Sequence, residues 1–440
     1  MNVEIEFTAV LDADGMITFG LAGSGVSRVW RCAADEQAVI DALDRVPWGP
    51  QPAGAAETVH AVGTLLRGKL ATADPVRHAL TEAFAGAAGI GGVRAVRFVI
   101  GDPAVEAVPF ETLWDEPLRM FPGLDPRWTI ARSPAGAVEP PGPFTMTRAV
   151  RLVAILAAEG EDGGPQLEAL RAAVAGHPGL PVEATVITSS FAMKAKLDEE
   201  AAPGWTAELV PASAAALIER LRMLRPQLLH IFCHGTAAGP RLLISQQELA
   251  TLELTAGHLA ELARPAGLAP WLTTLNCCES AAPGETLGSI AAAVVRSGLP
   301  AALGMRRPVS VDMAGEFCAD LYHAVVDRLA TVAGTGRTPA ELDWARVLTG
   351  PRSALCTRIG AVRDVAGRQR EWTLPVLYLA AGAMRIRGRP TGDLDDAAVD
   401  AQVAALSFVD GLERAGNLLP GMAGEMRRPS LDLLYPEGRP

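Results

Sequence analysis

Two residues of this chain could combine a nucleophile with its base: His234 and Cys278. Each follows an apolar stretch, Leu228 to Cys233 before the histidine and Trp271 to Asn276 before the cysteine pair. A thiol is only slightly ionised at neutral pH, and a nearby imidazole can take its proton and stabilise the thiolate. If the two stretches are neighbouring parallel strands, both side chains reach one crevice at the carboxyl edge of the sheet. The pattern therefore indicates nucleophilic catalysis of acyl transfer.

The residues that flank this pair have other interpretations. Gly235 lets the backbone turn sharply and expose the imidazole, and the N–H groups of Gly235 and Cys278 are candidate oxyanion donors. Cys233 and Cys277 each precede a candidate by one position, and we expect them to be buried as small apolar side chains. His230 is expected to be a core histidine.

A metal site is the alternative use of the same residues. His230 and His234 share one strand face, so together with Cys277 and Cys278 they could surround an ion. Adjacent cysteines are poor co-ligands for one tetrahedral zinc, and no second Cys-x-x-Cys arm exists. We therefore expect no metal and no other cofactor.

The elements that precede the pair divide at a cluster of proline and glycine, Pro134 to Pro143. Before it, three β-like stretches separated by turn residues predict a small antiparallel meander, followed by helical patterns and a further strand. We predict an amino-terminal lobe over residues 1–145. Its elements are the strands Val3 to Leu11, Met16 to Leu21, Val26 to Cys32 and Val96 to Ile100, with helices over about 35 to 88.

After the cluster, near-continuous apolar strands alternate with helices. This alternation is typical of a mainly parallel α/β sheet covered on both faces, and it defines a predicted domain over residues 146–387. The predicted strands are Arg151 to Ala157, Val182 to Ile187, Leu228 to Cys233, Leu242 to Ser245, Trp271 to Asn276 and Ala301 to Met305; the helices are Pro165 to Ala175, Ala214 to Leu224 and Leu287 to Ser297.

The last part of the chain, residues 388–440, changes character. A helix over Thr391 to Arg414 is predicted from apolar residues at helical spacing, and the final twenty residues are expected to be loose. A tail of this kind could act as an inhibitory or docking element.

Composition narrows the classes of partner. The formal net charge of -11 argues against nucleic acid as a direct partner, because binding the phosphate backbone needs a concentrated basic surface. Six scattered cysteines do not form a disulfide framework and suit a reducing cytoplasm. The first ten residues lack the basic and apolar regions of a signal peptide, and no apolar run reaches the ~20 residues of a membrane span. We expect a cytoplasmic protein that does not contact a membrane.

The sequence resembles the CHAT family, which includes bacterial and eukaryotic relatives of caspases and separase. The resemblance covers about residues 60 to 385. It is carried by Ile231-Phe232-Cys233-His234-Gly235, Leu275-Asn276-Cys277-Cys278-Glu279-Ser280 and Gly284-Glu285-Thr286-Leu287-Gly288, with Val108-Pro109-Phe110-Glu111-Thr112-Leu113 upstream and Phe317, Leu321-Tyr322 and Trp372 to Leu379 downstream. It implies a caspase-like fold whose amino-terminal lobe is a degenerate caspase-like half, and a peptidase dyad of His234 and Cys278. Cys277 stands where the family commonly has Ala.

Four further residues are candidates for substrate binding. Related peptidases that cleave after Arg or Lys place an acidic residue in the S1 pocket, and one such position falls here on Asn276, which is uncharged. Another corresponds approximately to Asp312. Arg306 and Arg307 lie nearby in the sequence and offer the opposite preference, for an acidic residue.

The leading hypothesis is a regulated endopeptidase that cleaves one or few cytoplasmic proteins. The family resemblance implies a role in bacterial stress, immunity or cell-death signalling. A protein substrate and a regulatory protein partner are then expected. The alternative is a scaffold of the same fold whose groove binds a peptide without cutting it.

Overall fold

The computed structural model describes most of the chain. The described residues are 3–11, 17–21, 27–30, 34–45, 55–71, 94–117, 119–140, 142–236, 241–247, 250–263, 269–278, 289–357, 371–419 and 421–436, with the single positions 74, 77, 78, 81, 280 and 282. The predicted motif from Gly284 to Gly288 lies outside them, as do Met16, Val26, Cys32 and Glu279.

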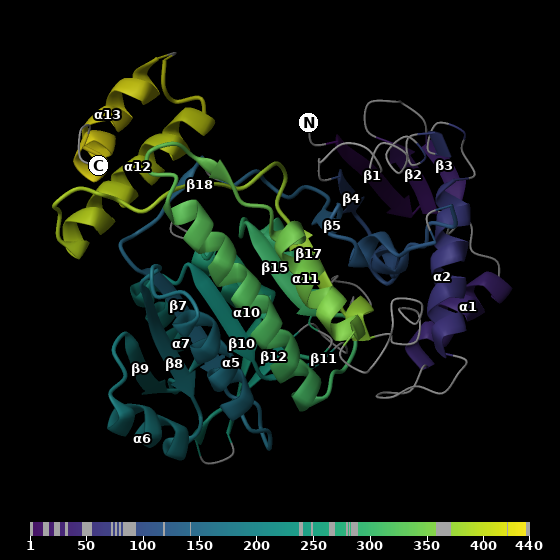
Figure 1. Cartoon of the computed structure of the whole chain (residues 1–440), viewed down its shortest axis with the longest axis horizontal. Coiled ribbons are helices and arrows are strands. Elements are labelled where there is room, and N and C mark those ends of the chain that lie inside the picture. Colours follow the sequence, from purple (N-terminus) through teal and green to yellow (C-terminus); the bar gives the residue numbers. More distant parts are fainter. Residues whose placement is uncertain are drawn as a thin grey trace.

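A twelve-stranded sheet forms the centre of the molecule (Figure 1). The strand order is β3-β2-β1-β4-β5-β17-β15-β14-β10-β7-β8-β9. Among the described strands of this sheet, antiparallel pairing is confined to β1–β2, β2–β3 and β15–β17. The predicted mainly parallel α/β sheet and the amino-terminal meander are thus confirmed. The strands are β1 (Val3–Leu11), β2 (Ile17–Leu21), β3 (Ser27–Trp30), β4 (Arg94–Ile100), β5 (Trp128–Pro134), β7 (Val150–Leu156), β8 (Val182–Thr188), β9 (Trp205–Leu209), β10 (Leu228–Phe232), β14 (Leu272–Leu275), β15 (Ala301–Met305) and β17 (Pro375–Leu379).

Helices cover both faces of the sheet. One face packs against α1 (Ala34–Arg45), α2 (Ala55–Leu70), α5 (Gly164–Ala175), α6 (Phe191–Glu200), α10 (Val311–Ala333) and α11 (Trp344–Thr357). The other face packs against α7 (Ala214–Leu224), α8 (Ala256–Ala260), the turn η4 (Glu261–Ala263) and α9 (Ile290–Arg296). None of the helices in the described part of the chain is long and apolar enough to cross a lipid bilayer.

The two halves of the sheet differ in burial. Every residue of β10 and β14 is buried, which is the pattern of a strand covered on both faces. In β4, by contrast, Val96, Phe98 and Ile100 are buried while the alternate residues are partly exposed, so one face is less covered.

The two halves meet at β5 and β17, and we call this junction the seam. Only one residue pair, Tyr378 with Arg132, is in register there. Side chains provide further links: the Ser133 hydroxyl donates to the Leu379 carbonyl at 2.9 Å, and the Arg352 guanidinium of α11 donates to the Ile130 carbonyl at 3.5 Å and to the Pro375 carbonyl at 2.6 Å. The predicted boundary from Pro134 to Pro143 follows β5 directly, and the division into 1–145 and 146–387 stays a prediction.

Three short segments lie in the chain between β4 and β5, and a fourth precedes β17. They are the helix α4 (Pro103–Glu106) and the turns η1 (Phe110–Thr112), η2 (Pro122–Leu124) and η6 (Glu371–Thr373). A small separate sheet is formed by β16 (Ala340–Glu341), β18 (Arg385–Arg387) and β6 (Phe144–Thr145).

One predicted strand belongs elsewhere. Leu242 to Ser245 does form a strand, β12 (Arg241–Ser245), but it is not part of the large sheet. It pairs antiparallel with β11 (His234–Thr236) and β13 (Thr251–Thr255). The segment that begins at His234 is therefore held as a hairpin strand above the sheet.

The carboxy-terminal part is more ordered than predicted. The predicted helix is α12 (Asp396–Arg414), but the expectation of a loose final segment is wrong, because α13 (Met422–Leu434) forms there. The two helices pack as a hairpin through Val399, Val403, Leu406 and Leu434. Figure 1 shows this hairpin at the periphery of the molecule.

Candidate active site

The strands that lead to His234 and Cys278 are direct neighbours. β10 and β14 are parallel, with Leu228 level with Leu272 and Ile231 level with Leu275. The Asn276 N–H continues this pairing by donating to the Ile231 carbonyl at 2.9 Å. Both strands therefore end at the same edge, which confirms the arrangement expected from the sequence.

Gly235 brings the two segments into contact. A Cβ atom placed on Gly235 would lie 2.0 Å from the Cys278 carbonyl oxygen and 3.7 Å from Cβ of Cys277. No side chain fits such a gap, so glycine is required for close approach of the two backbones. The sequence predicted a turn-forming glycine; the structure shows Gly235 within β11, with close packing as the reason for the residue type.

His234 is partly exposed and oriented by the chain that follows β7. Its Nε2 lies 2.7 Å from the carbonyl oxygen of Glu159. A carbonyl can only accept, so Nε2 carries the hydrogen of the neutral imidazole and Nδ1 keeps its lone pair. This tautomer leaves Nδ1 able to accept a proton.

Cys278 is also partly exposed, in contrast to the cysteine before it. Its sulfur lies 3.9 Å from the carbonyl oxygen of Val309, one residue before the Ser310 N-cap of α10. The nucleophile candidate is thus bordered by the β11 segment on one side and by the start of α10 on the other.

Cys233 and Cys277 form a buried pair beneath the site. Their sulfurs lie 3.3 Å apart, and the Cys277 thiol donates to the Ile231 carbonyl at 3.2 Å. Burial raises the pKa of Cys233 well above its ordinary value, so this thiol stays protonated. The prediction that both residues serve packing is confirmed.

His230 is a core residue, as predicted. It is fully buried, its ring lies edge-on to Tyr322 at 5.3 Å, and burial lowers its pKa to about 3. It packs in the cluster that faces α10, whereas Cys277 packs in the cluster that faces α7 and α9. Because the two side chains lie on opposite faces of the sheet, the alternative metal site does not assemble. Within the described residues, no group of three His, Cys, Asp or Glu side chains is placed to hold a metal ion.

The four substrate-binding candidates lie at different depths. Asn276 is 1% exposed, and its amide donates to Oε1 of Gln166 at 3.1 Å and to the Ala314 carbonyl at 2.9 Å. In this conformation its side chain supports the strand end and is shielded from a substrate. Arg306 is 3% exposed and also lies below the surface. Arg307 is partly exposed, and Asp312 is exposed in the first turn of α10.

Two supporting residues were not predicted. Glu159 acts through its backbone carbonyl, so no side-chain pattern in the sequence could identify it. Ser280 bridges two strands, because its hydroxyl donates to the Leu275 carbonyl at 2.8 Å and accepts from the Met305 N–H at 2.9 Å. The resemblance motif contained Ser280, but nothing in the sequence indicated this bridging contact.

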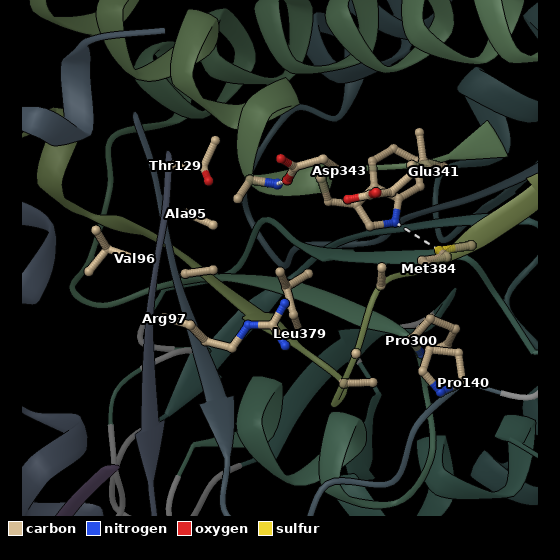
Figure 2. Close-up of a pocket in the computed structure, with 17 residues that line it drawn as sticks. Ala95, Val96, Arg97, Thr129, Pro140, Pro300, Glu341, Asp343, Leu379 and Met384 are labelled. Carbon is tan, nitrogen blue, oxygen red and sulfur yellow. Dashed lines mark hydrogen bonds between the residues drawn. The ribbon is translucent and has the colours of Figure 1, made fainter. Parts of the chain in front are cut away.

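A cavity of about 220 Å³ lies away from this site, at the seam. Figure 2 shows Arg97 on one wall and Glu341 and Asp343 on another. Pro300, which also lines the cavity, directly precedes β15, whereas Cys278 follows the carboxyl end of the parallel neighbour β14. The cavity and Cys278 therefore lie at opposite ends of these strands. None of the predicted site residues lines it.

A family model described as the CHAT domain matches residues 61–340, which is more than half of the chain. The chain belongs to the CHAT-domain family. No curated protein sequence matches it. Among solved structures, this CHAT-domain protein is similar to the Saccharomyces cerevisiae separase–securin complex, with 13% identity, a TM-score of 0.35, and coverage of 83% of this chain but only 21% of the separase chain. It is also similar to the complex of Porphyromonas gingivalis RgpB pro- and mature domains, with 11% identity, a TM-score of 0.42, and coverage of 75% and 77%.

Proposed function

We propose that this CHAT-domain protein is a cysteine endopeptidase with Cys278 as nucleophile and His234 as general base. The observation that carries the proposal is the contact of Gly235 with the Cys278 backbone, because it holds the two strand ends together. Membership of the CHAT-domain family supports the same assignment.

In the proposed reaction, Nδ1 of His234 takes the proton of the Cys278 thiol. The thiolate attacks the carbonyl carbon of the scissile peptide bond, and the N–H groups of Gly235 and Cys278 stabilise the oxyanion that forms. The imidazolium then protonates the departing amine, which leaves a thioester. Water, activated by the same imidazole, hydrolyses the thioester and restores the thiol. The Glu159 carbonyl holds the imidazole in the required tautomer throughout.

The substrate is a protein, and the exposed candidates favour a basic residue at the cleavage site. Asp312 is exposed at the start of α10, three residues after Val309, whose carbonyl contacts Cys278. Arg307 provides the opposite preference, for an acidic residue. A positional peptide library with Asp312→Asn and Arg307→Gln variants distinguishes the two, since only one substitution should abolish the preference.

The first prediction concerns the dyad itself. Cys278→Ala should abolish peptide cleavage, and His234→Ala should lower kcat/KM by about 100-fold or more, because general base catalysis contributes on that order. The measurement is cleavage of a fluorogenic peptide library. Cys318→Ala is the matched control, since Cys318 is buried in α10 away from the site. Cleavage by Cys278→Ala at the wild-type rate would overturn the proposal. If neither the wild type nor any variant cleaves a peptide, and the wild type binds peptides tightly, the result would favour the scaffold alternative.

A further inference from the structure

A buried carboxylate links the amino-terminal half of the chain to the segment after Cys278. Glu106, at the end of α4, is 3% exposed. Its Oε2 accepts a hydrogen bond from the Ser289 N–H at 2.8 Å, across 183 positions of sequence. Ser289 is the N-cap of α9, and α9 packs against β5, β17 and β15, so this contact lies where the two halves of the sheet meet.

The first turn of α9 is in turn bonded to the neighbourhood of the nucleophile. The Ala291 N–H donates to the Ser280 carbonyl at 3.2 Å, and Ser280 follows Cys278 by two residues. The Ser280 N–H donates to the Cys277 carbonyl at 3.3 Å. Glu106 is therefore connected to the peptide before Cys278 by three hydrogen bonds, which are joined through the backbone from Ser289 to Ala291 and through Ser280.

Charged and titratable groups surround the Glu106 carboxylate on several elements. Asp102, the N-cap of α4, repels it, while Arg132 on β5 and Arg296 on α9 attract it. Tyr378 on β17 is a further neighbour that interacts with Glu106 through charge, and the Glu111 carboxylate shares Arg132 with it. Burial is the largest influence, and the net effect raises the pKa of Glu106 to about 7. The carboxylate can therefore change its charge near neutral pH.

We propose that Glu106 is a positioning residue for Cys278: its ionised carboxylate holds Ser289 and α9, and through Ser280 fixes the segment that carries the nucleophile. The inference rests on the proposed role of Cys278. An ionised acceptor makes a shorter and stronger hydrogen bond than a neutral one, so protonation of Glu106 loosens this hold.

The test compares wild type with Glu106→Gln, which keeps the shape and an acceptor oxygen but cannot ionise. Alkylation of Cys278 by iodoacetamide is measured by mass spectrometry in both proteins between pH 5.5 and 8.5. The quantity compared is the ratio of the alkylation rate constants of Glu106→Gln and wild type at each pH. The ionisation of Cys278 and His234 is common to both proteins and cancels in the ratio. We expect a ratio near one at pH 5.5 that departs by about fivefold above pH 8, with a midpoint near 7.

Glu183→Gln is the matched control, because Glu183 is an exposed carboxylate on β8, remote from the seam. Its ratio to wild type should stay at one across the range. A flat ratio for Glu106→Gln, with an unchanged thermal transition at pH 5.5, would overturn the inference. Alkylation needs no peptidase activity, so a protein that labels as expected but cleaves nothing would instead contradict the proposed function.

Discussion

Glu106 and Glu111 lie in consecutive short helical segments, α4 and η1, and both carboxylates are buried at the seam. Glu111 accepts two hydrogen bonds from Arg132, from Nε at 2.9 Å and from Nη2 at 2.6 Å. Burial alone would raise the pKa of Glu111, but the charge and hydrogen bonds of Arg132 outweigh it and hold the pKa below its ordinary value. The carboxylate of Glu106 accepts from a neutral N–H, and its pKa is raised.

Burial raises the pKa of both carboxylates, so the difference between them comes from the hydrogen-bond partner, which is a charged guanidinium for Glu111 and a neutral N–H for Glu106. Glu111 stays ionised at physiological pH and fastens η1 to β5 as half of an ion pair. Glu106 is poised between two charge states. One residue is suited to a fixed link between the halves, and the other to a link that depends on conditions.

The largest expected effect comes from removing the fixed link. Glu111→Gln leaves Arg132 as a fully buried charge without its counterion, which should lower the free energy of unfolding at pH 7 by about 3–5 kcal/mol. The pKa of Glu111 is lowered, so its contribution is present above the carboxyl's ordinary pKa and is lost as pH falls through the lower, folded value. Urea denaturation at pH 7 and in strong acid should therefore show a difference that shrinks in acid. A destabilisation that is the same in strong acid as at pH 7 would argue against an ion pair.

The second prediction has the opposite sign. The raised pKa of Glu106 means that its ionisation destabilises the fold, so wild type should lose stability as pH rises from about 4.5 to 7. Glu106→Gln removes this loss and should be more stable than wild type by about 3 kcal/mol at pH 8, with near equality at pH 4. Thermal unfolding at both pH values measures the difference. If Glu106→Gln is less stable than wild type at pH 8, ionised Glu106 stabilises the fold as Glu111 does, and the described contrast between the two carboxylates is contradicted.

The smallest effect tests the origin of that difference. Asp102 caps α4 by accepting from the Ala104 N–H at 2.8 Å, and its charge repels Glu106. Asp102→Asn preserves a capping oxygen and removes the charge, so the pH midpoint of the Glu106 effect should move down by a few tenths of a pH unit. The same stability titration detects it. A midpoint that moves up would contradict the assigned repulsion.

The sequence predicted the parts of the site that depend on local pattern. Apolar strands ending near His234 and Cys278 are visible in the residue order, and the parallel sheet that aligns them follows from their alternation with helices. The close approach at Gly235 could not be derived, because it depends on the distance between two backbones and not on the turn chemistry of one. Asn276 reads as a polar neighbour of the nucleophile, yet its amide is bonded to Gln166 and Ala314, whose positions only the fold defines.

Long-range polar contacts and the carboxy-terminal end were the main omissions. Glu106 stands in an ordinary Ala-Val-Glu-Ala-Val context, and its partner Ser289 is brought near only by the packing of α9. In α13, Gly424 and Pro429 weaken the helical signal, and the helix is stabilised by tertiary packing of Leu434 against α12.

The seam also constrains how the chain is made. Ser133 and Leu379, which bond to each other there, are 246 positions apart. During synthesis from the amino terminus, β5 leaves the ribosome long before β17, and it has no strand neighbour on that side until β17 has been translated. An unpaired strand edge is a template for association with other chains. The nascent amino-terminal half therefore depends on its own loops, or on a chaperone, to shield β5 until β17 arrives.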